Sequence, residues 1–117
     1  MRRVAMSRLD SLLSLTDGWD GPGSISVSKQ ALTNYTHFID LLGPRVRLDA
    51  EPMATPNGGI RMEWDRGENS YVAEIEGNGG MFLCKLGSSP IDDREIELPY
   101  TDFDLLIQFF EVGTIVS

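Results

Sequence analysis

The sequence has a single cysteine, Cys84, and a single histidine, His37, and both scarcities exclude classes of site. One thiol cannot form a disulfide or a cysteine-based zinc site within one chain, and this is compatible with a reducing cytoplasm, where we expect the protein to act. One imidazole cannot build a histidine metal cluster, and no nucleophile is obviously paired with it. We therefore expect no catalytic residue, no resident metal and no cofactor.

Long apolar runs and basic residues are scarce as well. No apolar stretch approaches the length of a membrane span, so we expect no membrane contact. Ten Lys/Arg against 18 Asp/Glu give a formal net charge of −8, and residues 49–117 hold four of these bases and fourteen of these acids. Such a field opposes nucleic-acid binding and favours a protein partner with a basic surface, although an acidic balance also serves solubility.

The helical patterns lie at the two ends of the chain. At 117 residues the chain suits one domain, residues 1–117, with a core of its own. Apolar spacing predicts a helix over residues 3–16 and another that begins at Ser26 or Ser28 and ends at Leu42, which together make an N-terminal helix pair. Thr101 is expected to cap a closing helix that ends at Gly113.

Between these helices the period changes to two, which is typical of strands. Asn57-Gly58 and Asn78-Gly79 are hairpin signals, and we take each as a two-residue loop. These loops pair Met53 with Met62 and Ile75 with Phe82, and a four-residue loop over residues 66–69 pairs Trp64 with Tyr71. The fold predicted is α+β: an antiparallel meander of about four strands with the helices on one face.

These registers divide the sheet residues into two faces. We prefer them because a slip of one residue would bury Glu63 and Glu74. The predicted inner face is Ile60, Met62, Trp64, Tyr71, Ala73, Ile75, Phe82, Cys84 and Leu86. The predicted outer face is Arg61, Glu63, Asp65, Val72, Glu74, Glu76, Met81, Leu83 and Lys85.

Carboxylates on neighbouring strands of this outer face are candidate functional groups. They are Glu63, Asp65, Glu74 and Glu76. Such a cluster could hold Mg²⁺ or Ca²⁺, or perform acid–base chemistry. The simpler interpretation is a solvated sheet face with Arg61 and Lys85 as counter-charges, because an open face lacks the enclosure that shifts pKa values.

Trp19 is unusual because the loop over residues 18–23 does not need an indole for its geometry. Either Trp19 tucks under the helix pair as a plug, with Asp20 bonding local backbone amides, or it anchors a partner, since Trp is enriched at interface hot spots.

Two short motifs resemble a family of small, uncharacterised bacterial and phage-associated proteins. One is the Trp19-Asp20-Gly21 loop, and the other is the strand Gly58 to Trp64, followed by Glu74-Ile75-Glu76. The resemblance covers roughly residues 9–80. It implies a bacterial or phage origin and a compact α+β fold, and it supplies no activity for any residue.

Two functions fit these observations. The first is a non-catalytic interaction protein, of the inhibitor, antitoxin, immunity or phage counter-defence type, whose acidic surface covers a basic site on a partner. Its candidate partner-binding residues are Glu63, Asp65, Glu68, Glu74, Glu76, Asp92, Asp93 and Trp19. A variant of this reading uses an apolar surface made of Trp19, Val72, Met81 and Leu83. The second is a small divalent-cation-dependent enzyme or ligand-binding domain that uses the sheet-face carboxylates.

Overall fold

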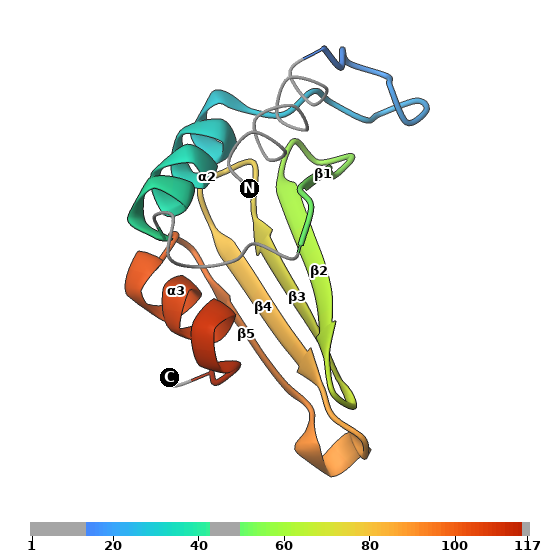
Figure 1. Ribbon diagram of the computed structural model, residues 1–117. Helices are drawn as coiled ribbons and strands as arrows, with labels where there is room; N and C mark the ends of the chain where they lie inside the picture. Colours follow the sequence, from blue (N-terminus) through green and yellow to red (C-terminus); the bar gives the residue numbers. More distant parts are fainter. Residues whose placement is uncertain (1–13, 43–49, 116–117) are drawn as a thin grey trace.

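The computed structural model describes residues 14–42 and 50–115, and it has the predicted α+β architecture, in which helices cover one face of an antiparallel sheet (Figure 1). Five strands follow one another across the sheet in chain order. They are β1 (Met53–Ala54), β2 (Ile60–Arg66), β3 (Asn69–Ile75), β4 (Met81–Leu86) and β5 (Arg94–Leu98). The helices are α2 (Lys29–Leu42), α3 (Phe103–Val112) and a short 3₁₀ turn, η1 (Pro90–Asp92).

The predicted N-terminal helix pair is not seen in the described residues. The predicted helix over residues 3–16 lies outside them except for residues 14–16, and these are not helical. The second predicted helix is α2, and it begins where Ser28 caps it: the Ser28 hydroxyl oxygen accepts a hydrogen bond from the Ala31 amide at 3.0 Å. The same hydroxyl donates to the carbonyl of Gly77 at 2.7 Å, so the cap also ties α2 to the β3–β4 loop.

The closing helix, α3, starts one residue later than predicted. Its cap is Asp102, whose carboxylate accepts from the Leu105 amide at 3.1 Å. The predicted cap, Thr101, instead donates its hydroxyl to the carbonyl of Gly79 at 3.0 Å, so it joins the helix start to the β3–β4 loop. Gly113 ends the helix as predicted, in a left-handed conformation with φ of 75°.

The β3–β4 hairpin corrects a predicted register. Gly79 has a φ of +93°, whereas Asn78 does not adopt a positive φ. A two-residue type I′ loop requires positive φ at both positions, so this turn is the three-residue kind with one left-handed glycine. The Glu76 amide donates to the carbonyl of Gly80 at 2.9 Å and closes a loop of residues 77–79.

The β1–β2 hairpin also has a three-residue loop where a two-residue loop was predicted. The Thr55 amide donates to the carbonyl of Gly59 at 3.0 Å, which closes a loop of residues 56–58. Met53 therefore pairs with Arg61, one residue away from the predicted Met62. The register between β2 and β3 does match the prediction, with Trp64 opposite Tyr71.

The extra loop residue turns β4 over. Ile75 pairs with Met81, not with Phe82, so Met81 and Leu83 face the helices and are fully buried. The predicted inward orientation of Phe82, Cys84 and Leu86 is wrong, as is the predicted outer apolar surface, which used Met81 and Leu83. The core that results lies between the sheet and the two helices. Its largest members include Tyr35, Phe38, Ile60, Met62, Trp64, Tyr71, Ile75, Met81, Leu83, Leu106, Phe109 and Phe110.

Candidate protein-binding face

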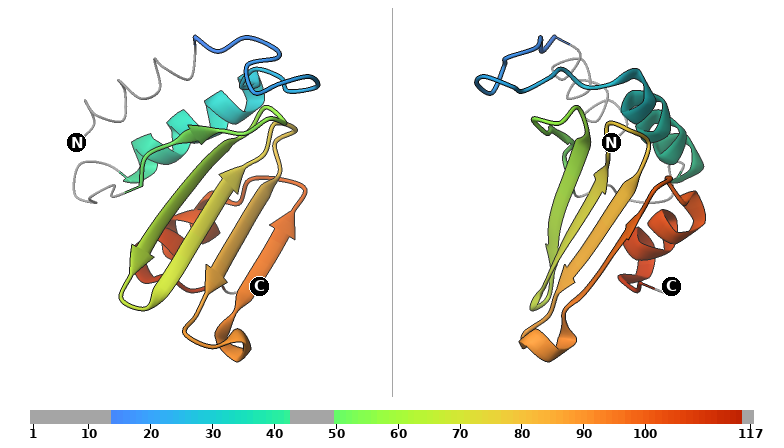
Figure 2. Two further views of the ribbon diagram at one scale, coloured as in Figure 1. Left: turned by 90° about the vertical axis from the view of Figure 1, so that its right-hand side faces the viewer. Right: turned by 180° about the vertical axis from the view of Figure 1, so that it is seen from behind.

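The sheet has one covered face and one face turned away from α2 and α3, which we call the open face (Figure 2, left). Charge is divided between the two. The acidic residues of strands β2 to β5 are all on the open face, on alternate positions from the buried residues: Glu63, Asp65, Glu74, Glu95 and Glu97. The basic residues at the positions that point to the helix side are Arg66, Lys85 and Arg94.

Arg61 is the one basic strand residue on the open face among the described residues, and its charge is already partnered. Its Nε lies 2.6 Å from a Glu63 carboxylate oxygen, and its Nη1 lies 3.6 Å from Glu74. One guanidinium therefore faces five strand carboxylates, and the open face keeps a net negative charge. A basic partner would meet a negative electrostatic potential over this face.

Apolar side chains occupy the middle of this face. The pairing places Glu63, Val72, Cys84 and Glu95 in one row across strands β2 to β5. Three strand spacings separate the outer two, which is roughly 14 Å. The open face thus has an apolar strip between the carboxylates of β2 and those of β5. This strip consists of Val72, Phe82, Cys84 and Leu86. Glu74 on β3 also lies between these two lines, opposite Phe82, and it is paired with Arg61.

The apolar strip is accessible along part of its length. Leu86 exposes 47% of its surface, while the other three members are half-buried. Two open hollows, of about 470 and 350 Å³, both include Leu86 in their linings. The larger is also lined by Glu63, Asp65 and Val72, and the smaller by Cys84, Asp93 and Glu95. The face is therefore contoured, with carboxylates beside each hollow.

A pair of carboxyl groups lies at the end of the open face nearest α2. The side chain of Glu76 extends over Gly80, where a Cβ atom would collide with its carboxyl oxygen. There Glu76 hydrogen-bonds Glu97, and burial, this bond and the charges of Glu97 and Glu74 raise the pKa of Glu76 to about 7. Burial also raises the pKa of Glu74, against the opposing effect of Arg61. The Glu76 carboxyl is thus partly protonated near neutral pH.

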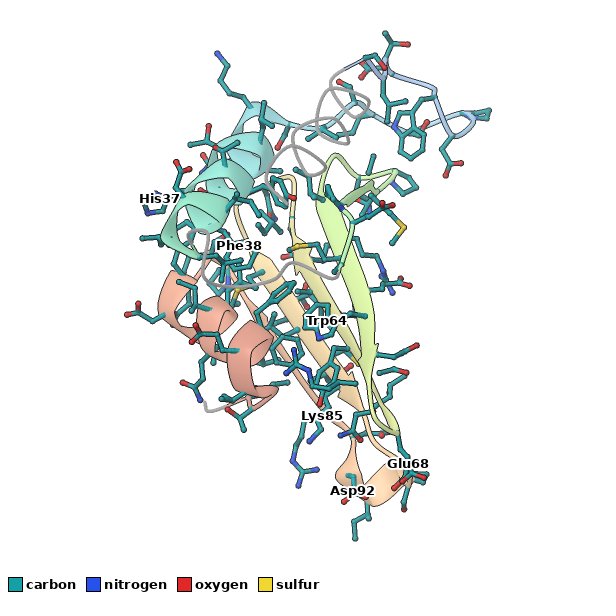
Figure 3. All side chains as sticks on the ribbon, viewed as in Figure 1. His37, Phe38, Trp64, Glu68, Lys85 and Asp92 are labelled. Atoms are coloured by element: carbon teal, nitrogen blue, oxygen red, sulfur yellow. The ribbon has the colours of Figure 1, made fainter. Side chains whose placement is uncertain are left out.

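The thiol of Cys84, on the open face, is not activated as a nucleophile. Burial raises the pKa of the Cys84 thiol, and the charges of Glu95 and Asp93 raise it further, so the thiol stays protonated. His37 is exposed on α2, on the other side of the sheet, with its ring edge-on to Phe103 at 4.6 Å (Figure 3). Within residues 14–42 and 50–115, no three His, Cys, Asp or Glu side chains are placed to share a metal ion.

The structure brings together four of the eight predicted partner-binding residues on the open face. They are Glu63, Asp65, Glu74 and Glu76. Glu68, in the β2–β3 loop, and Asp92, in η1, both lie at the end of the sheet farthest from α2 (Figure 3), in two different loops, and Asp93 follows η1. The sequence analysis did not include Glu95 and Glu97 among the site residues. Their alternation with Ile96 was a signal that both lie on the same face of β5.

Trp19 lies apart from the open face. It is half-buried, and its indole N–H donates to the carbonyl of Ile25 at 2.8 Å within its own loop. The carboxylate that bonds the local backbone is Asp17, which accepts from the Ser26 amide, and not the predicted Asp20. The indole thus has a structural task in closing this loop.

Comparisons with known proteins identified no relative of this chain. No family model matches the chain, and no curated protein or solved structure matches it. The resemblance based on the Trp-Asp-Gly loop and the Gly58 to Trp64 strand therefore stays a prediction. Among the helices that the structure describes, none has the length and apolar character to cross a membrane.

Proposed function

We propose that this chain is a non-catalytic protein-binding module, of the inhibitor, antitoxin, immunity or counter-defence type, whose open face binds a basic surface of a partner protein. The observation that carries the proposal is the division of charge between the two faces of the sheet. Solubility alone needs charges of both signs spread over the surface. A face with five strand carboxylates and one partnered guanidinium is instead suited to steering a cationic partner.

The division of charge follows from the alternation of the strands and needs no added element. In β2 the acids Glu63 and Asp65 alternate with Met62 and Trp64, which pack into the core. The basic residue beside them on β2 is Arg61, and its charge is neutralised by Glu63 and Glu74. A partner's cations would therefore find carboxylates with few competing cations nearby, which favours both orientation and association rate.

The experiment compares two pairs of substitutions that change the net charge equally. Glu63→Gln/Glu95→Gln removes two charges from the open face, and Asp104→Asn/Glu111→Gln removes two from α3. A partner is first identified by cross-linking and affinity capture from the source cells, and is then produced alone for association kinetics at low and high salt.

We expect the open-face pair to slow association by about tenfold at low salt and to flatten the salt dependence, with little change in dissociation. The α3 pair should behave as the unsubstituted protein does. Equal effects of the two pairs would mean that only overall charge matters, and they would refute an interface on the open face.

A further inference from the structure

We infer that the segment bound by the open face is a basic amphipathic α-helix, seated with its apolar side on the strip of Val72, Phe82, Cys84 and Leu86 and with Lys or Arg residues on both flanks. This inference rests on the proposed function, and it names the chemistry of the partner.

The first argument is the fit of widths. The carboxylates of Glu63 on β2 and Glu95 on β5 stand at the two ends of one row, roughly 14 Å apart at the backbone. An α-helix with its side chains is about 10–12 Å across. Three of the four strip residues lie on β4 and Val72 lies on β3, so a helix seated on the strip lies between the two lines of carboxylates. Long Lys or Arg side chains on its two flanks would reach toward both lines.

The second argument excludes an added strand. The apolar strip belongs to β3 and β4, which are both paired on each side, β3 with β2 and β4, and β4 with β3 and β5. Their backbone donors and acceptors are already used within the sheet, so an extended peptide over the strip would gain no ladder of hydrogen bonds. A helix satisfies its own backbone and needs only side-chain contacts, which is what this face supplies.

The third argument excludes a second copy of the chain and an anionic surface. Two open faces brought together would set five strand carboxylates against five others, with Arg61 of each already bound to Glu63. Like charges that face each other across an interface oppose association. Nucleic acid and anionic lipid are excluded on the same ground. Charge complementarity thus favours a cationic protein segment.

The test uses a fluorescent synthetic peptide of about 16 residues, long enough to cover a strand of β3's length when helical. It carries leucine along one helical stripe and lysine on both flanks. A scrambled peptide of the same composition, without the stripe, is the control. Anisotropy measures affinity, circular dichroism measures helix gained on binding, and amide shift mapping locates the site.

We expect the stripe peptide to bind about tenfold more tightly than the scrambled one, because the apolar stripe adds burial to an equal charge. It should gain helix on binding and shift amides of β3 and β4. Leu86→Ser should cost about tenfold in affinity for the stripe peptide alone. Glu63→Gln/Glu95→Gln should weaken both peptides, and Asp104→Asn/Glu111→Gln should weaken neither.

Equal binding of the two peptides, or binding without helix gained, would overturn the helix inference and leave the acidic face as a site for basic partners. No binding of either peptide, or equal loss in the two charge pairs, would overturn the proposed function with it. Circular dichroism of the free Leu86→Ser protein checks its fold. If that variant does not fold, shift mapping on the unsubstituted protein decides between β3–β4 and α3.

Discussion

Leu83→Ala and Phe82→Ala, made side by side in β4, should differ sharply in stability. Leu83 is fully buried against the helices, and removing its side chain leaves a cavity that the surrounding core cannot fill. A change of this kind costs about 2–5 kcal/mol, which for a domain of this size lowers the melting temperature by roughly 8–20 °C. Phe82 is half-buried on the open face, where solvent replaces the lost ring, so its removal should cost about 1 kcal/mol.

The assay is urea unfolding followed by circular dichroism, with thermal unfolding as a second measurement. Equal slopes of the free energy of unfolding against urea for both variants would show that only stability has changed. The contrast tests the three-residue loop at residues 77–79, because a two-residue loop would bury Phe82 and expose Leu83. A larger loss in Phe82→Ala than in Leu83→Ala would refute the register, and with it the composition of the open face.

Three further outcomes follow from single contacts. Folding raises the pKa of Glu76 from 4.5 to about 7, so the protonated carboxyl stabilises the folded protein below pH 4.5, and this stabilisation is lost as pH rises through 7. Glu76→Gln should therefore raise the melting temperature at pH 8 and leave it unchanged at pH 4. Ser28→Ala removes the helix cap and the bond to Gly77, and should cost about 1–2 kcal/mol in urea unfolding, whereas Ser88→Ala, at an exposed position, should cost little. Gly113→Ala places a Cβ at a φ of 75° and 2.8 Å from the Tyr71 hydroxyl, so its melting temperature should fall, and an unchanged value would contradict the close packing there.

The fold was predictable where apolar and charged residues alternate along a strand. Alternation of Glu63 with Met62 and Trp64 identified β2 and its buried side, and the register with β3 followed. An Asn-Gly pair did not decide the hairpins. Asn-Gly suits both a type I′ loop and the end of a three-residue loop, and only the observed φ values separate the two.

The candidate site was predictable on β2 and β3 and not on β4 and β5. One extra loop residue reversed every β4 side chain, so the prediction assigned Phe82, Cys84 and Leu86 to the core and Met81 and Leu83 to the surface, whereas Val72 was placed correctly. The closeness of Glu76 and Glu97 could not be read from the sequence either. It depends on the position of Gly80, which has no side chain to separate the two carboxyls.

The most direct test of the open face as the binding surface uses Cys84, which is the only thiol of the chain and lies in the middle of the apolar strip. The rate of its alkylation by N-ethylmaleimide is measured with and without the bound partner. A matched control is Cys84→Ser carrying Glu111→Cys, which moves the thiol to α3. We predict that the partner slows alkylation at Cys84 at least about tenfold and leaves the α3 thiol unaffected. Unchanged alkylation at Cys84 in the saturated complex, or protection of the α3 thiol instead, would contradict the account.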